Sequence, residues 1–321
     1  RPGGLSQGDR EIVSIKCHIP VLMTAIFIGL AMTAAAQEEP VWVLVEKGKQ
    51  EFDKREYGLA LSYLKEAVER NPNLPEAYIV MGDIYRLTDN PLAEDYYRRA
   101  YRMKASMEIT EEVYIPLYRL SALFSEKGNY LEYERTLLAI LSEDGVYMNE
   151  HFKPFAAAFY STFSSRGLDR LLILYRISGF EYVVEAHGRL AWYYYRTGLY
   201  RESVIHSLFC LVGAVTEAFN EIRRHQPLYE FTTMKDFIAV AYRYGNVARY
   251  LLDEVDIFGK LYYLGTAARR QNGTRRAGEI WDIITESPFP NEYKGLSARQ
   301  RLAPFDEELL EVPDNGSYEW N

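Results

Sequence analysis

The stretch 57–74, YGLALSYLKEAVERNPNL, constrains the fold most, because small residues and a proline recur in it at fixed steps. Ala60 and Ala67 are seven residues apart, which places them on one face of a helix, and Pro72 follows five residues later. Gly48 lies on the helical stretch before them. Small side chains let two helix backbones approach closely, and proline cannot supply a helical N–H. The spacing therefore predicts an antiparallel helix pair that ends near Pro72.

The same pattern recurs in the next stretch. Gly82 lies on its first helix, and Ala93 and Ala100 lie on its second helix, again seven residues apart. We expect these small residues, like those of the first copy, to be the points where helices touch. The turn of this second copy is one residue shorter than that of the first.

Three weaker versions of the pattern follow, at residues 117–137, 190–210 and 261–281. Between them, segments 152–178 and 231–258 keep only traces of it. We interpret these two segments as degenerate helix pairs that continue the same array.

These residues resemble the tetratricopeptide repeat, a 34-residue helix–turn–helix unit. The resemblance covers about residues 41–290, within an expected helical repeat domain at 37–290. It implies an all-α fold, a right-handed solenoid of stacked antiparallel helix pairs, whose first helices line a concave groove that binds proteins or peptides. Residues 291–321 are expected to form an extended C-terminal tail, with a short helix near 305–311.

The N-terminal segment has the ingredients of a secretory signal peptide. Ile19–Ala36 is an uncharged run of 18 residues that follows Lys16 and ends in the small residues Ala34 and Ala36. Cleavage is expected after Ala36, which predicts a periplasmic or secreted protein of bacterial type. The alternative is an uncleaved membrane anchor. Asp9 and Glu11 are acidic where a signal peptide is basic, and we interpret residues 1–12 as an over-extended start.

Composition and motifs argue against several functions. The net charge of −8 disfavours a nucleic-acid partner, which needs a basic surface. Metalloprotease, Cys-x-x-Cys, nucleophile-elbow and phosphate-loop motifs do not occur, so we expect no enzyme activity, cofactor or metal site. After the signal segment the histidines are scattered singly, at positions 151, 187, 206 and 225, and the one cysteine, Cys210, is expected to be buried.

The leading hypothesis is an exported scaffold or adaptor that binds a protein or peptide in the cell envelope. The membrane would be contacted only through an uncleaved signal. An alternative is a small-ligand-binding accessory component of an envelope solute-uptake system, with the aromatic helices lining a closed pocket. An enzyme that carries the repeats as an appendage is the third and least favoured class.

The resemblance also implies which residues bind. Counting along the first helices of the 190–210 and 261–281 copies selects aromatic and arginine residues: Trp192, Tyr195, Arg196, Tyr262, Arg269 and Arg270. These types are enriched at binding hot spots, and they predict a ligand with an apolar anchor beside a carboxylate. In the competing interpretation, the tyrosine-rich helices only pack against one another.

Overall fold

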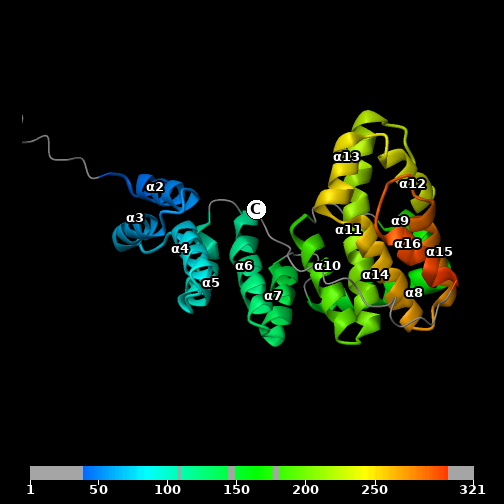
Figure 1. Cartoon of the computed structure of the whole chain (residues 1–321), viewed down its shortest axis with the longest axis horizontal. Helices are drawn as coiled ribbons and strands as arrows, with labels where there is room; N and C mark the ends of the chain where they lie inside the picture. Colours follow the sequence, from blue (N-terminus) through cyan, green and yellow to red (C-terminus); the bar gives the residue numbers. More distant parts are fainter. Residues whose placement is uncertain (1–38, 108–109, 144–148, 176–180, 303–321) are drawn as a thin grey trace, which may run out of the picture. The chain divides into compact units, whose positions relative to one another are not determined.

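The computed structural model describes residues 39–107, 110–143, 149–175 and 181–302, and over these ranges it contains 15 α-helices and no strand. Figure 1 shows their order along the chain. The expected all-α class, with helices packed in sequential antiparallel pairs, is confirmed. The expected signal segment with its cleavage site, and the helix near 305–311, lie outside the described residues.

Contacts divide the chain into two compact units, residues 1–72 and 73–321. In the first unit one helix pair is described, α2 (Val41–Asp53) with α3 (Tyr57–Arg70). Four such pairs form the frame of the second unit: α4 (Pro75–Leu87) with α5 (Leu92–Arg102), α6 (Tyr114–Glu126) with α7 (Tyr130–Glu143), α10 (Glu181–Arg196) with α11 (Tyr200–His225), and α14 (Ile257–Arg270) with α15 (Thr274–Glu286).

All five pairs share one turn geometry. The second residue after each first helix has a left-handed backbone, with φ between 51° and 78°: Arg55, Asp89, Gly128, Gly198 and Asn272. Its N–H bonds the carbonyl three residues back, and the next N–H bonds the carbonyl five residues back. In the fourth pair, for example, Gly198 donates to Tyr195 and Leu199 donates to Tyr194. This is the Schellman arrangement that ends a helix.

The small residues of the sequence pattern occupy one position in this shared geometry. Seven residues before each left-handed residue lies a side chain no larger than serine: Gly48, Gly82, Ser121, Ala191 and Gly265. A Cβ atom on Gly48 would lie 2.6 Å from Cγ of Leu64, and one on Gly265 would lie 2.7 Å from Nε1 of Trp281. On the second helices the expected contact residues are fully buried: Ala60, Ala67, Ala93 and Ala100.

The two degenerate segments do not form further stacked pairs, which corrects that interpretation. α7 packs directly against α10, and α11 packs directly against α14. The first segment forms α8 (Asn149–Arg166) and α9 (Leu168–Leu174), and α8 packs against α11 and contacts α15. Phe159 stacks on Phe209 of α11 at 4.4 Å, and Nε of Arg276 in α15 donates to the Ser164 carbonyl at 3.0 Å.

The second degenerate segment is broken into short pieces. It contains α12 (Met234–Ala241), α13 (Gly245–Arg249) and a π-helical turn at Tyr250–Glu254. α12 packs against α11 and α15, and Nζ of Lys235 lies 2.8 Å from a carboxylate oxygen of Glu286. Aromatic contacts such as that of Tyr242 with Phe289, 4.9 Å between ring centroids, take the place of the small–small contacts of the regular pairs.

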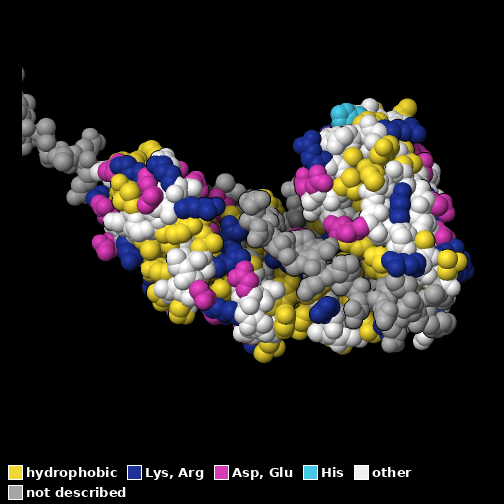
Figure 2. Space-filling view, viewed as in Figure 1, with side chains coloured by type: hydrophobic (Ala, Val, Ile, Leu, Met, Phe, Trp, Pro, Cys, Tyr) yellow, Lys and Arg dark blue, Asp and Glu magenta, His cyan; other side chains and the backbone are white. Residues whose placement is uncertain are grey.

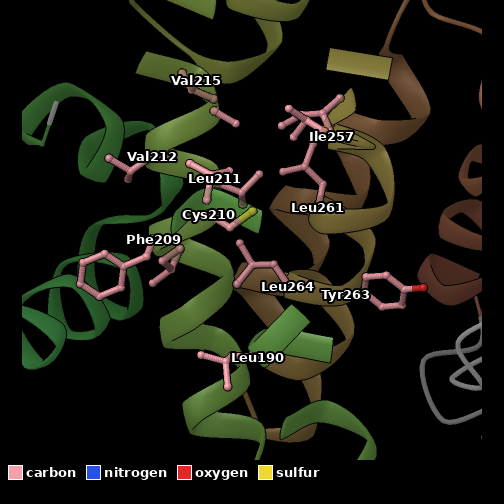
Figure 3. Close-up of a cluster of buried hydrophobic side chains, with 14 of the residues drawn as sticks. Leu190, Phe209, Cys210, Leu211, Val212, Val215, Ile257, Leu261, Tyr263 and Leu264 are labelled. Carbon is pink, nitrogen blue, oxygen red and sulfur yellow. The ribbon is translucent and has the colours of Figure 1, made fainter. Parts of the chain in front are cut away.

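The long helix α11 lies at the centre of the second unit. In Figure 3, Leu211 faces Leu261 and Leu264 of α14, whereas Phe209 and Val212 point to the other side of α11. Among the described helices, α11 is the one long and apolar enough to cross a membrane, but 89% of its apolar window is buried inside the protein. Such burial is typical of the core helix of a globular fold.

The expectation of an extended tail from residue 291 is wrong for its first part. Residues Tyr293–Leu302 form helix α16, which packs against α15 and α14. Tyr293, Ser297 and Gln300 form its buried face. Three residues on one face, spaced by four and three positions, are the signature of an amphipathic helix.

Candidate functional site

The first helices α10 and α14 end in arginines at equivalent positions. Arg196 and Arg270 each lie two residues before the left-handed residue of their turn. The guanidinium carbon of Arg196 lies 5.6 Å from the ring centroid of Trp192, and that of Arg270 lies 5.8 Å from the ring centroid of Tyr200. Each arginine thus stacks over an aromatic face, a cation–π arrangement that planar guanidinium groups favour.

Tyr195 connects the two helices. Its ring centroid lies 6.4 Å from that of Tyr263 in α14, and its hydroxyl is hydrogen-bonded to Thr266 and Arg270. Burial raises the pKa of Tyr195, although these hydrogen bonds oppose the shift. The phenol therefore stays neutral at neutral pH and holds the end of α10 against the end of α14.

We call this region the α10–α14 surface. It consists of Trp192, Tyr195, Arg196, Tyr200, Arg269 and Arg270. Arg196 and Arg270 are exposed, Trp192, Tyr200 and Arg269 are half-buried, and Tyr195 is buried beneath them. Of the six sequence-predicted residues, Tyr195 thus contacts Arg270 and Arg196 contacts Trp192, while Arg269 adjoins Arg270 along α14. The structure adds Tyr200, which the sequence reasoning missed and whose ring centroid lies 5.6 Å from that of Tyr195. Tyr200 is the first residue of α11, directly after the turn. The turn geometry, had it been known, would have placed Tyr200 beside the end of α10.

Tyr262 is a correction, because it belongs to the core. Its side chain is 0% exposed, and its ring centroid lies 5.5 Å from that of Tyr293 in α16. It points away from solvent because α16 covers this side of α14, where the sequence predicted an extended tail. Tyr195 is likewise 8% exposed and supports the surface from below without facing outward. The competing packing interpretation is thus correct for these two tyrosines.

The arginines of the earlier helices have a different environment. Arg86 pairs with Glu126, and Nε of Arg119 lies 3.0 Å from Oδ1 of Asp83. In Figure 2, basic and acidic side chains lie next to each other over much of the visible face. By contrast, Arg196 stacks on Trp192 and forms no ion pair with any described residue. The α10–α14 surface thus keeps positive charge beside aromatic rings on a chain whose net charge is negative.

Two histidines that look isolated in the sequence meet in the core. Nδ1 of His187 in α10 lies 2.8 Å from Nδ1 of His206 in α11, and both residues are buried. Phe152 and Phe209 pack around the pair, with ring centroids 4.9 Å apart for His187 and Phe209. Burial lowers the pKa of His206 to about 3 and holds that of His187 well below its ordinary value.

The shared turn register could have revealed this pair. His187 lies eleven residues before the left-handed residue of its turn and His206 lies eight residues after it. In other pairs core residues occupy these positions, for example Leu261 and Ile280 in α14 and α15. Within the described part of the chain, no group of three or more His, Cys, Asp or Glu residues is placed to hold a metal ion.

Comparison with known proteins finds a likeness that covers most of the chain. No protein-family model matches the chain. The chain is 24% identical, over 278 residues, to a protein of Borreliella burgdorferi that is described as an uncharacterized protein. The match covers 77% of this chain and 85% of the relative. The likeness therefore extends over most of both proteins and is not confined to one helix pair.

Proposed function

We propose that this chain is an exported, non-enzymatic scaffold of the tetratricopeptide-repeat type, which binds a protein segment through the α10–α14 surface. The observation that carries the proposal is the pair of equivalent arginines, Arg196 and Arg270, each stacked on an aromatic ring at the end of successive first helices. A surface that repeats along an array suits an extended ligand, because successive residues of the ligand meet successive helices.

The repeat assignment is supported by geometry as well as by sequence. Five helix pairs share one Schellman turn and one small residue seven positions before it. That regularity is expected when each pair is a copy of one supersecondary unit. The solenoid form and the concave groove are part of this proposal.

The chemistry of the surface suggests the class of ligand. Arginine that is stacked and held at a ring edge can bind a carboxylate with two parallel hydrogen bonds, and the ring itself offers apolar contact. Trp192 is half-buried, so part of its ring is already shielded from water before a ligand binds. A ligand side chain that covered the rest of the ring would complete its desolvation, as at binding hot spots. We therefore propose an acidic segment that also carries an aromatic or branched apolar residue.

The proposal is tested by screening the purified chain against an array of random 12-residue peptides. We expect the bound peptides to be enriched in Asp or Glu together with Leu, Phe, Tyr or Trp. Trp192→Ala and Arg270→Ala should each weaken binding of the best peptide by about tenfold, since truncating a hot-spot residue typically costs 1–2 kcal/mol or more. Arg243→Ala, which removes an exposed arginine from another element, is the matched control and should bind like wild type.

Two results would contradict the proposal. The first is a set of bound peptides with no acidic enrichment, and the second is equal loss of binding in Arg243→Ala and Arg270→Ala. If the array is silent but a small metabolite from the envelope binds and is lost in Trp192→Ala, the small-ligand role is the correct one. Export is tested separately by sequencing the mature N-terminus, which we expect to begin at Gln37.

A further inference from the structure

The 19 residues that follow α16 have a composition that complements the α10–α14 surface. Residues 303–321, APFDEELLEVPDNGSYEWN, contain six acidic residues and no basic one, so residues 1–302 carry a net charge of only −2. The same segment holds the apolar side chains of Leu309, Leu310, Tyr318 and Trp320. It therefore combines carboxylates with apolar anchors, which is the ligand chemistry that the surface favours.

Helix α16 packs against α14, the helix that carries Arg269 and Arg270 of this surface. α16 contacts both α14 and α15, and the ring centroid of Tyr293 in α16 lies 5.5 Å from that of Tyr262 in α14. Arg270 follows Tyr262 by eight residues along the same helix, a rise of about 12 Å. An extended chain of 19 residues can reach roughly 60 Å, so every residue of the surface is within range of the segment that begins at Ala303.

We propose that the acidic segment 303–321 binds the α10–α14 surface of its own chain, with its carboxylates on Arg196 and Arg270 and an aromatic residue beside Trp192. The segment then occupies the surface when no partner is present and competes with the partner for it. This inference rests on the proposed function, because it assigns the same surface an internal competitor. A tethered ligand has an effective concentration of about 1 mM, so even a weak intrinsic affinity is enough for occupancy.

The occupancy is tested by photo-cross-linking in the full chain. The photoreactive residue p-benzoylphenylalanine replaces Tyr318, and the cross-linked protein is digested with trypsin and mapped by mass spectrometry. We expect links to the tryptic peptides 190–196, 197–201 or 261–269, all in monomeric protein. Sodium chloride at 1 M should reduce the yield, because it screens the charges. Links that map elsewhere on the chain, or none at all, would overturn the inference.

Matched variants separate charge recognition from simple proximity. Replacing four acids of the segment (Asp306→Asn, Glu307→Gln, Glu308→Gln and Glu311→Gln) leaves the described helices unchanged and should lower the cross-linking yield about fivefold. The double variant Arg196→Glu/Arg270→Glu should lower it similarly, and adding Asp306→Arg/Glu308→Arg should restore it. An unchanged yield in the neutralised segment would contradict the inference whether or not the arginine variants fold.

Other occupants give different results. A cross-linked dimer whose yield rises with protein concentration would show that the segment binds a second copy, and would overturn binding within one chain. In the neutralised variant, we expect the best acidic peptide of the array to bind about tenfold more tightly than in wild type. If that peptide binds both proteins equally and no internal link forms, the inference fails while the proposed function stands. If the internal link forms but no peptide binds even the neutralised variant, the proposed function fails.

Discussion

A Cβ atom built on Gly82 in α4 would lie 2.5 Å from Cε1 of Tyr97 in α5. The Tyr97 ring is fully buried, and its hydroxyl donates a 2.7 Å hydrogen bond to Oδ1 of Asp83. The ring therefore cannot move aside without breaking this hydrogen bond and its core contacts. The glycine and the tyrosine therefore define how closely the two helices approach.

Gly82→Ala is expected to destabilise the protein for this reason, even though alanine is the better helix former. Overpacking of this kind typically costs about 1–3 kcal/mol, and Gly82→Leu should cost more. Gly295→Ala is the matched control, because Gly295 is exposed in α16 and an added Cβ would meet nothing within 4 Å. That variant should be neutral or more stable by about 0.5–1 kcal/mol. Chemical denaturation measures both, and a Gly82→Ala protein as stable as wild type would refute the contact.

Tyr262→Ala should remove a large part of the core at α14 and α16. The side chain is 0% exposed and packs on Tyr293, and truncating a buried aromatic residue typically costs about 3–5 kcal/mol. Arg269→Ala, seven residues along the same helix, should change the free energy of unfolding by less than about 0.5 kcal/mol. If the two variants were equally stable, Tyr262 could not be a core residue, and its assignment to the core would be wrong.

The buried histidine pair predicts that stability falls in acid. Both pKa values are lower in the folded state than the ordinary value of 6.5, so the unfolded chain binds more protons below that pH. The free energy of unfolding should therefore decrease as the pH falls from about 6.5 toward 3, by up to about 1.4 kcal/mol per pH unit for each histidine. His206→Gln should flatten this slope relative to wild type. Parallel curves for His206→Gln and wild type would count against the prediction.

Cys210 is expected to be unreactive in the folded protein. It is fully buried, and burial raises the pKa of its thiol to about 12. In a Cys17→Ser background, modification by a disulfide reagent at pH 8 should be about a thousandfold slower than after unfolding in guanidinium chloride. Ala298→Cys on the exposed face of α16 supplies the fast control. Comparable native rates at positions 210 and 298 would show that α11 is accessible.

The local part of the fold could be predicted because it depends on contacts within one helix pair. Gly48 and Ala60 indicate a helix–helix contact, and Pro72 indicates the end of a helix pair. All of these features involve neighbours fewer than 35 residues away. Tyr262 could not be assigned in this way, because what covers it is α16, some thirty residues later. The position of α8 depends on a still more distant contact, between Ser164 and Arg276, which no helical periodicity encodes.

The candidate surface was predictable for the residues that point outward and not for those beneath them. Trp192, Arg196 and Arg270 follow from their positions at the ends of first helices. The role of Tyr195 depends on a hydrogen bond to Arg270 from a helix 75 residues away, which composition does not reveal. The histidine pair was missed for a related reason. His187 and His206 are 19 positions apart, and their contact can be inferred only when the register of the turn between α10 and α11 is known.

The hydrogen bond from Arg276 to the Ser164 carbonyl spans 112 residues, and this separation has a consequence during synthesis. At about 5–20 residues per second, α8 and α9 leave the ribosome roughly 6–22 seconds before α15 exists to cover them. Over that interval the Ser164 carbonyl lacks its Arg276 donor, and Gly167, where α9 begins, lacks the neighbouring side chains of Arg276 and Glu279. A holding chaperone that bound α8 and α9 during this interval would cover contacts that only α15 can complete.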